Sequence, residues 1–361
     1  MTKVVNIGKV KIGGGNPVAI QTMANRDPHD ELALLSQIRE NALLGCDIIR
    51  LTVPDHEAAV VFGRVKKDLL SEGLDIPMVA DIHFDHKMAL EAIEQGADKI
   101  RINPGNIGST EKVREVVNAA RGRHVPIRVG VNSGSLEKDI LEKNGGVTAE
   151  GLAESGLRNL RIIEDMGYDD LVVSIKSSDV KMTYDAHMIL SRMTDHPMHV
   201  GITEAGTLRG GQVKSAAGIG ALLLNGIGDT IRVSLTADPT EEVRYAQEIL
   251  KALGLRKSAV DLVSCPTCGR TKIDLQGLAQ EVERGLEPIE KRLQEEGRPG
   301  IKVAVMGCAV NGPGEAREAD YGVAGGNGEG LLFKKGIIIE KVPEDRIVDA
   351  LMKLIETDMG L

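Results

Sequence analysis

The sequence is poor in aromatic residues: Phe, Tyr and Trp make up 2% of 361 residues, and tryptophan is absent. The hydrophobic core must therefore consist of Val, Ile, Leu, Ala and Met. No apolar run reaches the roughly 18 residues of a membrane span, so we expect no membrane contact. Residues 1–15 contain no long apolar stretch. We therefore expect no signal peptide and a cytoplasmic location.

Basic charge and cysteine are also scarce. There are 44 Lys and Arg against 53 Asp and Glu, a net charge of −9. A chain this acidic is not expected to bind nucleic acid. Cysteine occurs only four times. In a reducing compartment, metal binding or catalysis is a more frequent use of cysteine than a disulfide.

Short β-branched runs recur from residue 18 to residue 237, and helical patterns such as Glu31–Leu44 and Glu111–Arg121 separate them. Eight strands that alternate with helices predict an α/β fold, a (β/α)8 TIM-type barrel. A doubly wound open sheet is the alternative, and the count of eight and the absence of a GxGxxG turn after the first strand disfavour it. The predicted strands are Val18–Met23, Cys46–Val53, Ile76–Phe84, Lys99–Pro104, Pro126–Asn132, Asp170–Ser177, Met198–Glu204 and Thr230–Ala237.

The barrel is expected to span residues 1–256. Asp238 begins a helix start signal, with a proline next and a glutamate three residues after the cap. Gly254 is expected to end that helix. Residues 257–361 are expected to form a small α/β domain. Its predicted parts are a cysteine loop, a helix near Leu275–Glu296, a strand at Ile301–Met306, a glycine-rich loop, strands at Leu331–Lys334 and Ile337–Glu340, and a helix near Pro343.

Charged side chains gather at the C-terminal ends of the predicted strands, where TIM barrels place their active sites. Any one of these cations could be an ordinary surface residue. Five of them at the ends of five strands indicate an anion pocket instead, because these groups match phosphate oxygens. The cations are Arg50, Arg101, Arg128, Lys176 and Arg232. The candidates for proton transfer are Asp81, His83 and Glu204. Asn132 and Ser234 lie an even number of residues from a cation on the same strand, so they are expected to face inward as well.

Three of the four cysteines lie in the second domain. Residues 265–268 read CPTC, and Cys308 follows a predicted strand. A CxxC loop is compatible with a zinc ribbon, a redox dithiol or an iron–sulfur site. A zinc ribbon would need a second pair of ligands, which the sequence lacks. A redox dithiol would leave Cys308 without a role. Three thiolates suit a four-iron cluster, and Glu315 after a Gly-Pro-Gly turn is a candidate for the fourth iron. Cys46, inside a barrel strand, is interpreted as core packing.

The sequence resembles the 4-hydroxy-3-methylbut-2-enyl diphosphate synthase family of the non-mevalonate isoprenoid pathway, in its bacterial two-domain form. The resemblance covers nearly the whole chain, and GCxVNGPGEA together with a CPxCGR loop is its most specific part. It implies reductive ring opening and dehydration of 2-C-methyl-D-erythritol 2,4-cyclodiphosphate, with flavodoxin or ferredoxin as electron donor. The motifs are CPTCGRT, GCAVNGPGEA, IRLTVP, ADIHF, RINPGNIG, IRVGVNSGSL, SIKSSD and ITEAG.

The resemblance also implies roles for individual residues. The ligands of one [4Fe-4S] cluster would be Cys265, Cys268, Cys308 and Glu315. The residues that hold the diphosphate would be Arg50, Arg101, Arg128 and Lys176. The rest of the pocket would be lined by Asp81, His83, Asn132, Glu204, Arg232 and Ser234. A non-redox iron–sulfur dehydratase and an iron sensor or cluster carrier remain as alternative functions.

The expected path of the chain favours a homodimer. Barrel helices run antiparallel to their strands, so the helix after the eighth strand ends at the face opposite the anion pocket. A return to the same barrel is possible on length alone. A second domain that closes a partner's barrel does not have to return along the wall of its own barrel, and a two-fold axis creates two identical sites. The family resemblance implies the same arrangement.

Overall fold

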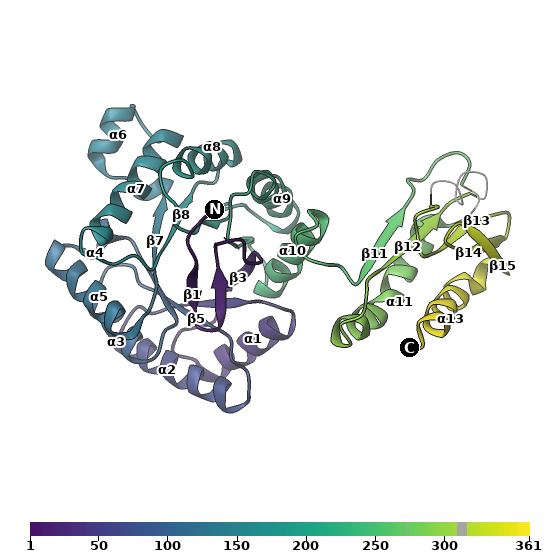
Figure 1. Cartoon of the computed structure of the whole chain (residues 1–361), viewed down its shortest axis with the longest axis horizontal. Helices are drawn as coiled ribbons and strands as arrows, with labels where there is room; N and C mark the ends of the chain where they lie inside the picture. The colour runs from purple at the N-terminus through teal and green to yellow at the C-terminus, as the bar shows by residue number, and fades with distance from the viewer. Residues whose placement is uncertain (272, 309–315) are drawn as a thin grey trace. The chain divides into compact units, whose positions relative to one another are not determined.

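The computed structural model describes residues 1–271, 273–308 and 316–361. Contacts within the chain divide it into two compact units, Met1–Arg256 and Lys257–Leu361. In Figure 1 helices surround the strands of the first unit, and the second unit is a small sheet with helices beside it.

The first unit is built on eight parallel strands, in the spatial order β8-β7-β6-β5-β4-β3-β10-β9. A parallel bridge between Val173 and Met198 joins the two ends of this order, so the sheet is a nearly closed barrel. The predicted barrel is confirmed, and the open sheet is excluded. The strands are β3 (Ala19–Met23), β4 (Ile48–Thr52), β5 (Met78–Asp81), β6 (Lys99–Ile102), β7 (Ile127–Asn132), β8 (Leu171–Lys176), β9 (His199–Val200) and β10 (Thr230–Ile231).

Helices follow the strands, and aspartates begin many of them. The carboxylate of Asp238 accepts a hydrogen bond from the backbone N–H of Thr240 at 3.0 Å, as the predicted helix start requires. Asp30, Asp55 and Asp179 cap helices in the same way. The helices are α1 (Glu31–Leu43), α2 (His56–Ser71), α3 (His86–Glu94), α4 (Pro104–Ile107), α5 (Thr110–Arg123), α6 (Lys138–Asn144), α7 (Ala149–Glu164), α8 (Val180–Leu190), α9 (Leu208–Leu224) and α10 (Pro239–Ala252).

An N-terminal hairpin, which the sequence analysis did not predict, covers one end of the barrel. Its strands are β1 (Val5–Ile7) and β2 (Val10–Ile12). The hairpin packs its apolar side chains against Ile48 and Val172, near the starts of β4 and β8. The N-terminal end of the barrel is therefore covered, and the C-terminal strand ends are the face at which a ligand is expected.

All eight barrel strands are shorter than predicted. β5 ends at Asp81, so His83 lies in the loop that follows it. β9 ends at Val200, and Glu204 lies in the following loop because its φ of 51° is incompatible with an extended strand. β10 ends at Ile231. Beyond it, the backbone N–H of Leu235 donates to the side chain of Glu242 at 3.0 Å instead of to a neighbouring strand. Glu204 and Ser234 are therefore loop residues.

The second unit contains a five-stranded sheet, β11-β12-β13-β14-β15. β11, β12 and β13 are parallel, and the last two strands are antiparallel to their neighbours. The helices α11 and α13 lie on one side of this sheet in Figure 1. The elements are β11 (Val260–Ser264), α11 (Leu275–Glu295), β12 (Ile301–Met306), β13 (Tyr321–Gly325), β14 (Glu329–Lys334), β15 (Ile337–Pro343) and α13 (Ile347–Met359).

The prediction of a glycine-rich loop before β14 was wrong over Tyr321–Gly325, which forms the central strand β13. Its glycines serve close packing rather than a turn. A Cβ atom at Gly322 would lie 2.3 Å from the ring of Phe333 on the neighbouring strand β14. A glycine in a strand often marks such a close approach.

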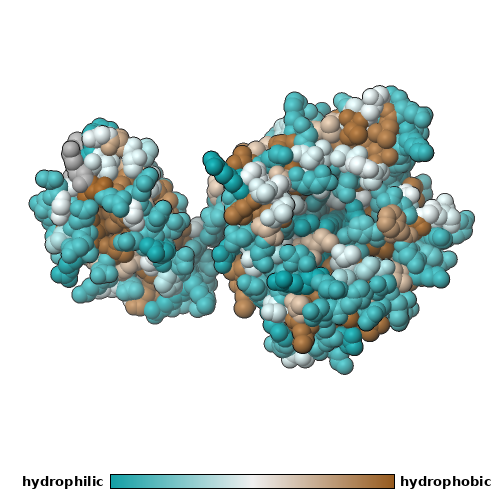
Figure 2. Space-filling view, turned by 180° about the vertical axis from the view of Figure 1, so that it is seen from behind, coloured by the Kyte–Doolittle hydropathy of each residue, from teal (hydrophilic) through white to brown (hydrophobic). Residues whose placement is uncertain are grey.

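The surface of the described residues is mixed. Figure 2 shows hydrophilic residues over most of the face that it draws, with hydrophobic residues in separate patches. The edge strand β15 contributes exposed apolar residues at Ile337–Ile339. Among the described residues, no helix combines the length and the hydrophobicity needed to cross a membrane.

Candidate active site

The C-terminal ends of β4, β5 and β6 place Asp81 between two arginines. Its Oδ1 lies 3.4 Å from Nη1 of Arg101, and its Oδ2 lies 3.9 Å from Nε of Arg50. Nε2 of His83 is 4.0 Å from the same Oδ2. Burial alone would raise the pKa of the Asp81 carboxyl, but the nearby guanidinium groups, chiefly of Arg50 and Arg101, hold this pKa below its usual value. Asp81 is therefore an ionised hydrogen-bond acceptor.

Three further cations of the barrel are buried. Arg128 on β7 is 1% exposed, and its Nε and Nη1 have no hydrogen-bond partner in the part of the chain that the structure describes. Nζ of Lys176 lies 3.1 Å from Nε2 of His199. Lys99, which the sequence analysis did not select, is fully buried and donates to Oε1 of Gln21 at 3.1 Å. Buried cations without balancing charge are costly, so this arrangement suits an anionic ligand.

Arg232 is fixed by a carboxylate that the sequence analysis missed. Glu242 on α10 is 4% exposed, and its two oxygens accept from Nε and Nη2 of Arg232 at 3.2 and 3.3 Å. The hydroxyl of Thr22 donates to the same carboxylate at 2.6 Å. Glu242 lies among the inward positions of α10, beside Val243 and Ala246. An acidic residue on the buried face of an amphipathic helix is the sequence signal that would have identified it.

The remaining candidates lie at the rim of the barrel. The side chain of His83 is 51% exposed, and Asn132 is the half-buried last residue of β7. In the described part of the chain, no hydrogen bond or ion pair links Glu204 or Ser234 to the cations. A left-handed backbone at a non-glycine residue such as Glu204 costs about 1–3 kcal/mol and persists only where the surroundings impose it. The structure thus gathers Arg50, Arg101, Arg128 and His83 around Asp81 and leaves Glu204 and Ser234 without a contact to this group among the described residues.

In the second unit, the ends of two neighbouring parallel strands place two cysteines near each other. Cys265 directly follows β11, and Cys308 comes two residues after the end of β12. The backbone N–H of Gly307 donates to Sγ of Cys265 at 3.2 Å. Cys268 is exposed, and hydrogen bonds from the backbone and side chain of Arg270 lower the pKa of its thiol. The lowered pKa of Cys268 favours the thiolate, the form in which cysteine binds metal.

The three cysteines of the second unit fit an iron–sulfur cluster better than a zinc ribbon or a redox dithiol. Residues 257–361 contain no histidine, so this unit offers no Cys₃His set for zinc. Cys46 lies in the barrel, where burial raises the pKa of its thiol to about 12, so it stays protonated. Glu315, the predicted fourth ligand, lies outside the described residues, and its role stays a prediction.

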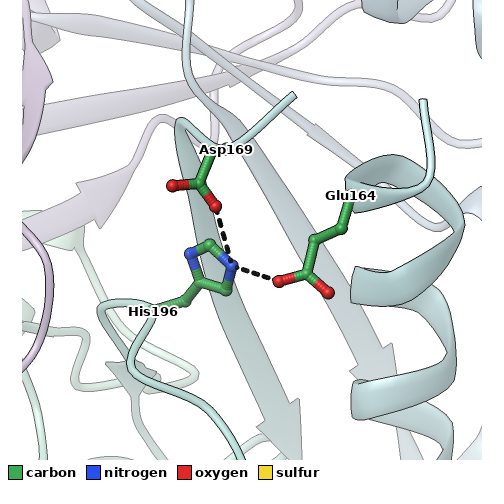
Figure 3. A group of neighbouring side chains, drawn as sticks. All are labelled: Glu164, Asp169 and His196. Atoms are coloured by element: carbon green, nitrogen blue, oxygen red, sulfur yellow. Dashed lines mark hydrogen bonds and ion pairs between the residues drawn. The ribbon is translucent and has the colours of Figure 1, made fainter. Parts of the chain in front are cut away.

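A separate group of potential metal ligands lies at the N-terminal end of the barrel, and Figure 3 shows its three side chains. Nε2 of the buried His196 is 2.9 Å from Oε1 of Glu164 and 3.7 Å from Oδ1 of Asp169. Nζ of Lys3 lies 2.8 Å from the same Asp169 oxygen and already supplies positive charge. We interpret this group as a structural polar contact that joins α7 to the segments before β8 and β9.

Together these features define a TIM-barrel protein with a group of buried cations near its strand ends and a small α/β domain that carries three cysteines. The GcpE TIM-barrel domain matches residues 2–247, and the GcpE protein C-terminal domain matches residues 261–357. The chain belongs to the GcpE family.

Curated relatives are similar over almost their whole length. The protein of Caldanaerobacter subterraneus subsp. tengcongensis is 54% identical over 99% of this chain and 97% of its own. That of Geobacter sulfurreducens is 53% identical over 98% of both chains. That of Bacillus subtilis is 53% identical over 98% of this chain and 91% of its own. Each is named 4-hydroxy-3-methylbut-2-en-1-yl diphosphate synthase (flavodoxin).

Solved structures share the barrel. Dihydropteroate synthase from Xanthomonas albilineans, in complex with 7,8-dihydropteroate, has a TM-score of 0.51 and 14% identity, over 70% of this chain and 99% of that one. Yersinia pestis dihydropteroate synthase has a TM-score of 0.50 and 12% identity, over 71% of this chain and 100% of that one. At such identities the similarity concerns the fold alone.

Proposed function

We propose that this protein converts 2-C-methyl-D-erythritol 2,4-cyclodiphosphate to 4-hydroxy-3-methylbut-2-enyl diphosphate by reductive ring opening and dehydration. The observation that carries the proposal is the buried cation group of the barrel, above all Arg128 with its unpartnered donors. Relatives that are 54% identical are named as the synthase of this product. That name favours the reductive reaction over a non-redox dehydratase, and a sensor or cluster carrier would have no use for the cations.

The barrel residues bind and orient the substrate. Arg128 offers Nε and Nη1 to phosphate oxygens, since guanidinium groups match phosphate geometry. Asp81 is ionised, so it accepts a hydrogen bond from a substrate hydroxyl and does not donate a proton. His83 and Glu204 at the rim are then the candidates to deliver the proton to the leaving oxygen. The residues that hold the diphosphate are Arg50, Arg101, Arg128 and Lys176, and those that line the rest of the pocket include Asn132, Arg232 and Ser234.

The second unit holds the cofactor in this proposal. Cys265, Cys268 and Cys308 bind a [4Fe-4S] cluster, with Glu315 as the fourth ligand. When bound, such a cluster supplies single electrons and a Lewis-acidic iron. The N–H of Gly307 donates to Sγ of Cys265 and fixes its position. We take flavodoxin as the electron donor, in line with the name of the relatives, with ferredoxin as the alternative. A reducing cytoplasm keeps the thiolates free of disulfides.

An anaerobic assay tests the function. Purified protein that carries its full iron content is expected to release the open-chain diphosphate from the cyclic diphosphate, and only when a strong reductant is present. The product is identified by mass and NMR. Turnover that does not need the reductant would establish the non-redox dehydratase. Intact cyclic diphosphate in the presence of iron-replete protein and reductant would refute the proposed reaction.

We also propose that the working unit is a homodimer in which each chain's cluster domain completes the barrel of its partner. Arg256 ends the first unit, and its Nη2 lies 3.4 Å from Oδ1 of Asp47, directly before β4. The chain therefore leaves the barrel at its N-terminal end. The 14 residues of α10 run from the C-terminal strand ends to this end, a distance of roughly 21 Å at the rise of an α-helix. Residues 257–265 reach up to roughly 30 Å when fully extended, so Cys265 could reach the pocket of its own barrel only along an extended path over the barrel wall, which a partner's barrel does not require.

Mixing two impaired variants tests this arrangement, at a substrate concentration low enough that Arg128→Met shows little turnover. Cys308→Ser lacks a cluster ligand, and Arg128→Met lacks a diphosphate contact. After subunit exchange, one composite site of each mixed dimer contains both native residues, so activity is expected to reappear, up to half of that of a native dimer. Differently tagged chains establish that mixed dimers form. Mixed dimers without activity would mean that each chain completes its own site.

A further inference from the structure

A buried chain of contacts lies beneath the anion pocket and links Lys176 to two residues outside the proposed binding set. Nζ of Lys176 lies 3.1 Å from Nε2 of His199, and Nδ1 of His199 lies 2.8 Å from Oγ1 of Thr230. Lys176 is 8% exposed, and the other two residues are fully buried. They come from β8, β9 and β10, and His199 pairs directly with Thr230 in the barrel sheet. The strands therefore hold the imidazole in a fixed place.

The contacts favour one tautomer of His199. When Lys176 is an ammonium group, it has no acceptor, so Nε2 then accepts from Lys176 and the ring proton lies on Nδ1. Nδ1–H then donates to Oγ1 of Thr230. A neutral lysine amine also donates to the same Nε2. With this tautomer His199 keeps its contact with Lys176 in both protonation states, so the imidazole can position Nζ before and after an anion enters.

The surroundings of Lys176 contain more positive than negative charge. Burial lowers the pKa of Lys176 well below its usual value, and the guanidinium groups around it, first that of Arg128, lower it further. A guanidinium group normally has a much higher pKa than an ammonium group, so lysine is the group that gives up its proton first. The charged or titratable groups around the pair are Arg50 on β4, Asp81 on β5, Lys99 and Arg101 on β6, Arg128 on β7, His187 on α8, Arg232 after β10 and Glu242 on α10.

The two carboxylates of this group are already engaged. Asp81 lies beside Arg50 and Arg101, and Glu242 pairs with Arg232. Among the described residues, neither carboxylate has a hydrogen bond or ion pair with Lys176. A bound diphosphate would bring the missing negative charge to Nζ. A negative charge within hydrogen-bond reach of an amine favours its protonated form.

We propose that His199, with its tautomer fixed by Thr230, is the positioning residue of Lys176, and that Lys176 takes up a proton from solvent as the diphosphate binds. The Nζ amine becomes an ammonium group that donates to a phosphate oxygen and to Nε2 of His199, which stays neutral throughout. The inference rests on the proposed function, because it takes the bound anion to be the cyclic diphosphate.

Calorimetry tests the proton uptake. Binding of the cyclic diphosphate to the native protein is measured in buffers of different ionisation enthalpy, from about pH 6 to about pH 9. We expect uptake of up to one proton, and its loss in Lys176→Met. Lys99→Met removes a second buried lysine, whose partner is an amide oxygen, and is expected to retain the uptake. Absence of binding to the native protein would contradict the proposed function. Binding without proton uptake, or uptake that disappears with Lys99 instead, would overturn this inference alone.

A matched pair at Thr230 tests the positioning role. Thr230→Val keeps the shape but removes Oγ1, and it is expected to raise KM for the cyclic diphosphate about fivefold and to shift the pH profile of binding, with a smaller effect on kcat. Thr230→Ser restores the hydroxyl and should restore both. An unshifted pH profile in a folded Thr230→Val protein would contradict the role. The ¹⁵N shifts of the native histidines give a second measure, since an Nε2–H tautomer at His199 would also overturn it.

Discussion

Replacing Cys308 with serine is expected to remove the bound iron and abolish turnover, while the barrel stays folded. Serine offers a harder oxygen that is protonated at neutral pH, so the second unit would keep only two thiolates. The barrel belongs to a separate compact unit with its own core, and it should not depend on this ligand. After anaerobic reconstitution, we expect about four irons and four sulfides per native chain, and almost none in the variant.

Cys46→Ser is the matched control. Cys46 is 6% exposed, and its thiol donates to the backbone oxygen of Ile48 at 3.1 Å, a contact that a serine hydroxyl can also make. Because burial raises the pKa of this thiol to about 12, it is not a metal ligand at neutral pH. Iron content should not change in Cys46→Ser. Stoichiometric zinc without sulfide in the native protein, or loss of iron in Cys46→Ser, would contradict the cluster assignment.

The barrel was predictable because its signal repeats: each unit has an apolar strand, a turn and a helix, and most helices begin at a recognisable cap. The failures were local. Tyr321–Gly325 resembles a loop because its glycines suggest a turn, whereas Gly322 makes room for Phe333 of the neighbouring strand. After β9, Glu204 adopts a left-handed backbone conformation, and after β10, Leu235 donates to the side chain of Glu242. Neither feature can be inferred from a short stretch of sequence.

The candidate site was predictable for residues that end barrel strands, because parity and charge select them directly. Their partners were not. Glu242 reaches Arg232 from a helix, and His199 meets Lys176 only because of the register between separate strands. Such contacts depend on three-dimensional packing, while a sequence pattern reports the face of one element at a time. Glu315 lies outside the described residues, so its role as a ligand still rests on the motif.

Arg128→Met is expected to have opposite effects on binding and on stability. Affinity for the cyclic diphosphate should fall tenfold or more, because each charge-assisted hydrogen bond contributes about 1.5–3 kcal/mol. The thermal stability of the substrate-free protein should rise. Burial and the neighbouring guanidinium groups lower the pKa of Arg128, which reflects how poorly its charge is compensated in the empty barrel. Methionine has a similar length and no charge, so it relieves that cost without leaving a large cavity.

Arg39→Met is the control for the loss of one arginine. Arg39 lies on α1, its side chain is 41% exposed, and it pairs with Glu72 at the surface. Exposed ion pairs contribute about 0–1 kcal/mol, so both the affinity and the melting temperature should stay close to native values. Titration calorimetry and thermal unfolding measure the two effects separately. An unchanged affinity in Arg128→Met would show that the buried guanidinium does not bind the diphosphate. A lower melting temperature would show that the Arg128 guanidinium stabilises the fold instead. Its removal is expected to stabilise the substrate-free protein only if its charge is uncompensated in the empty site.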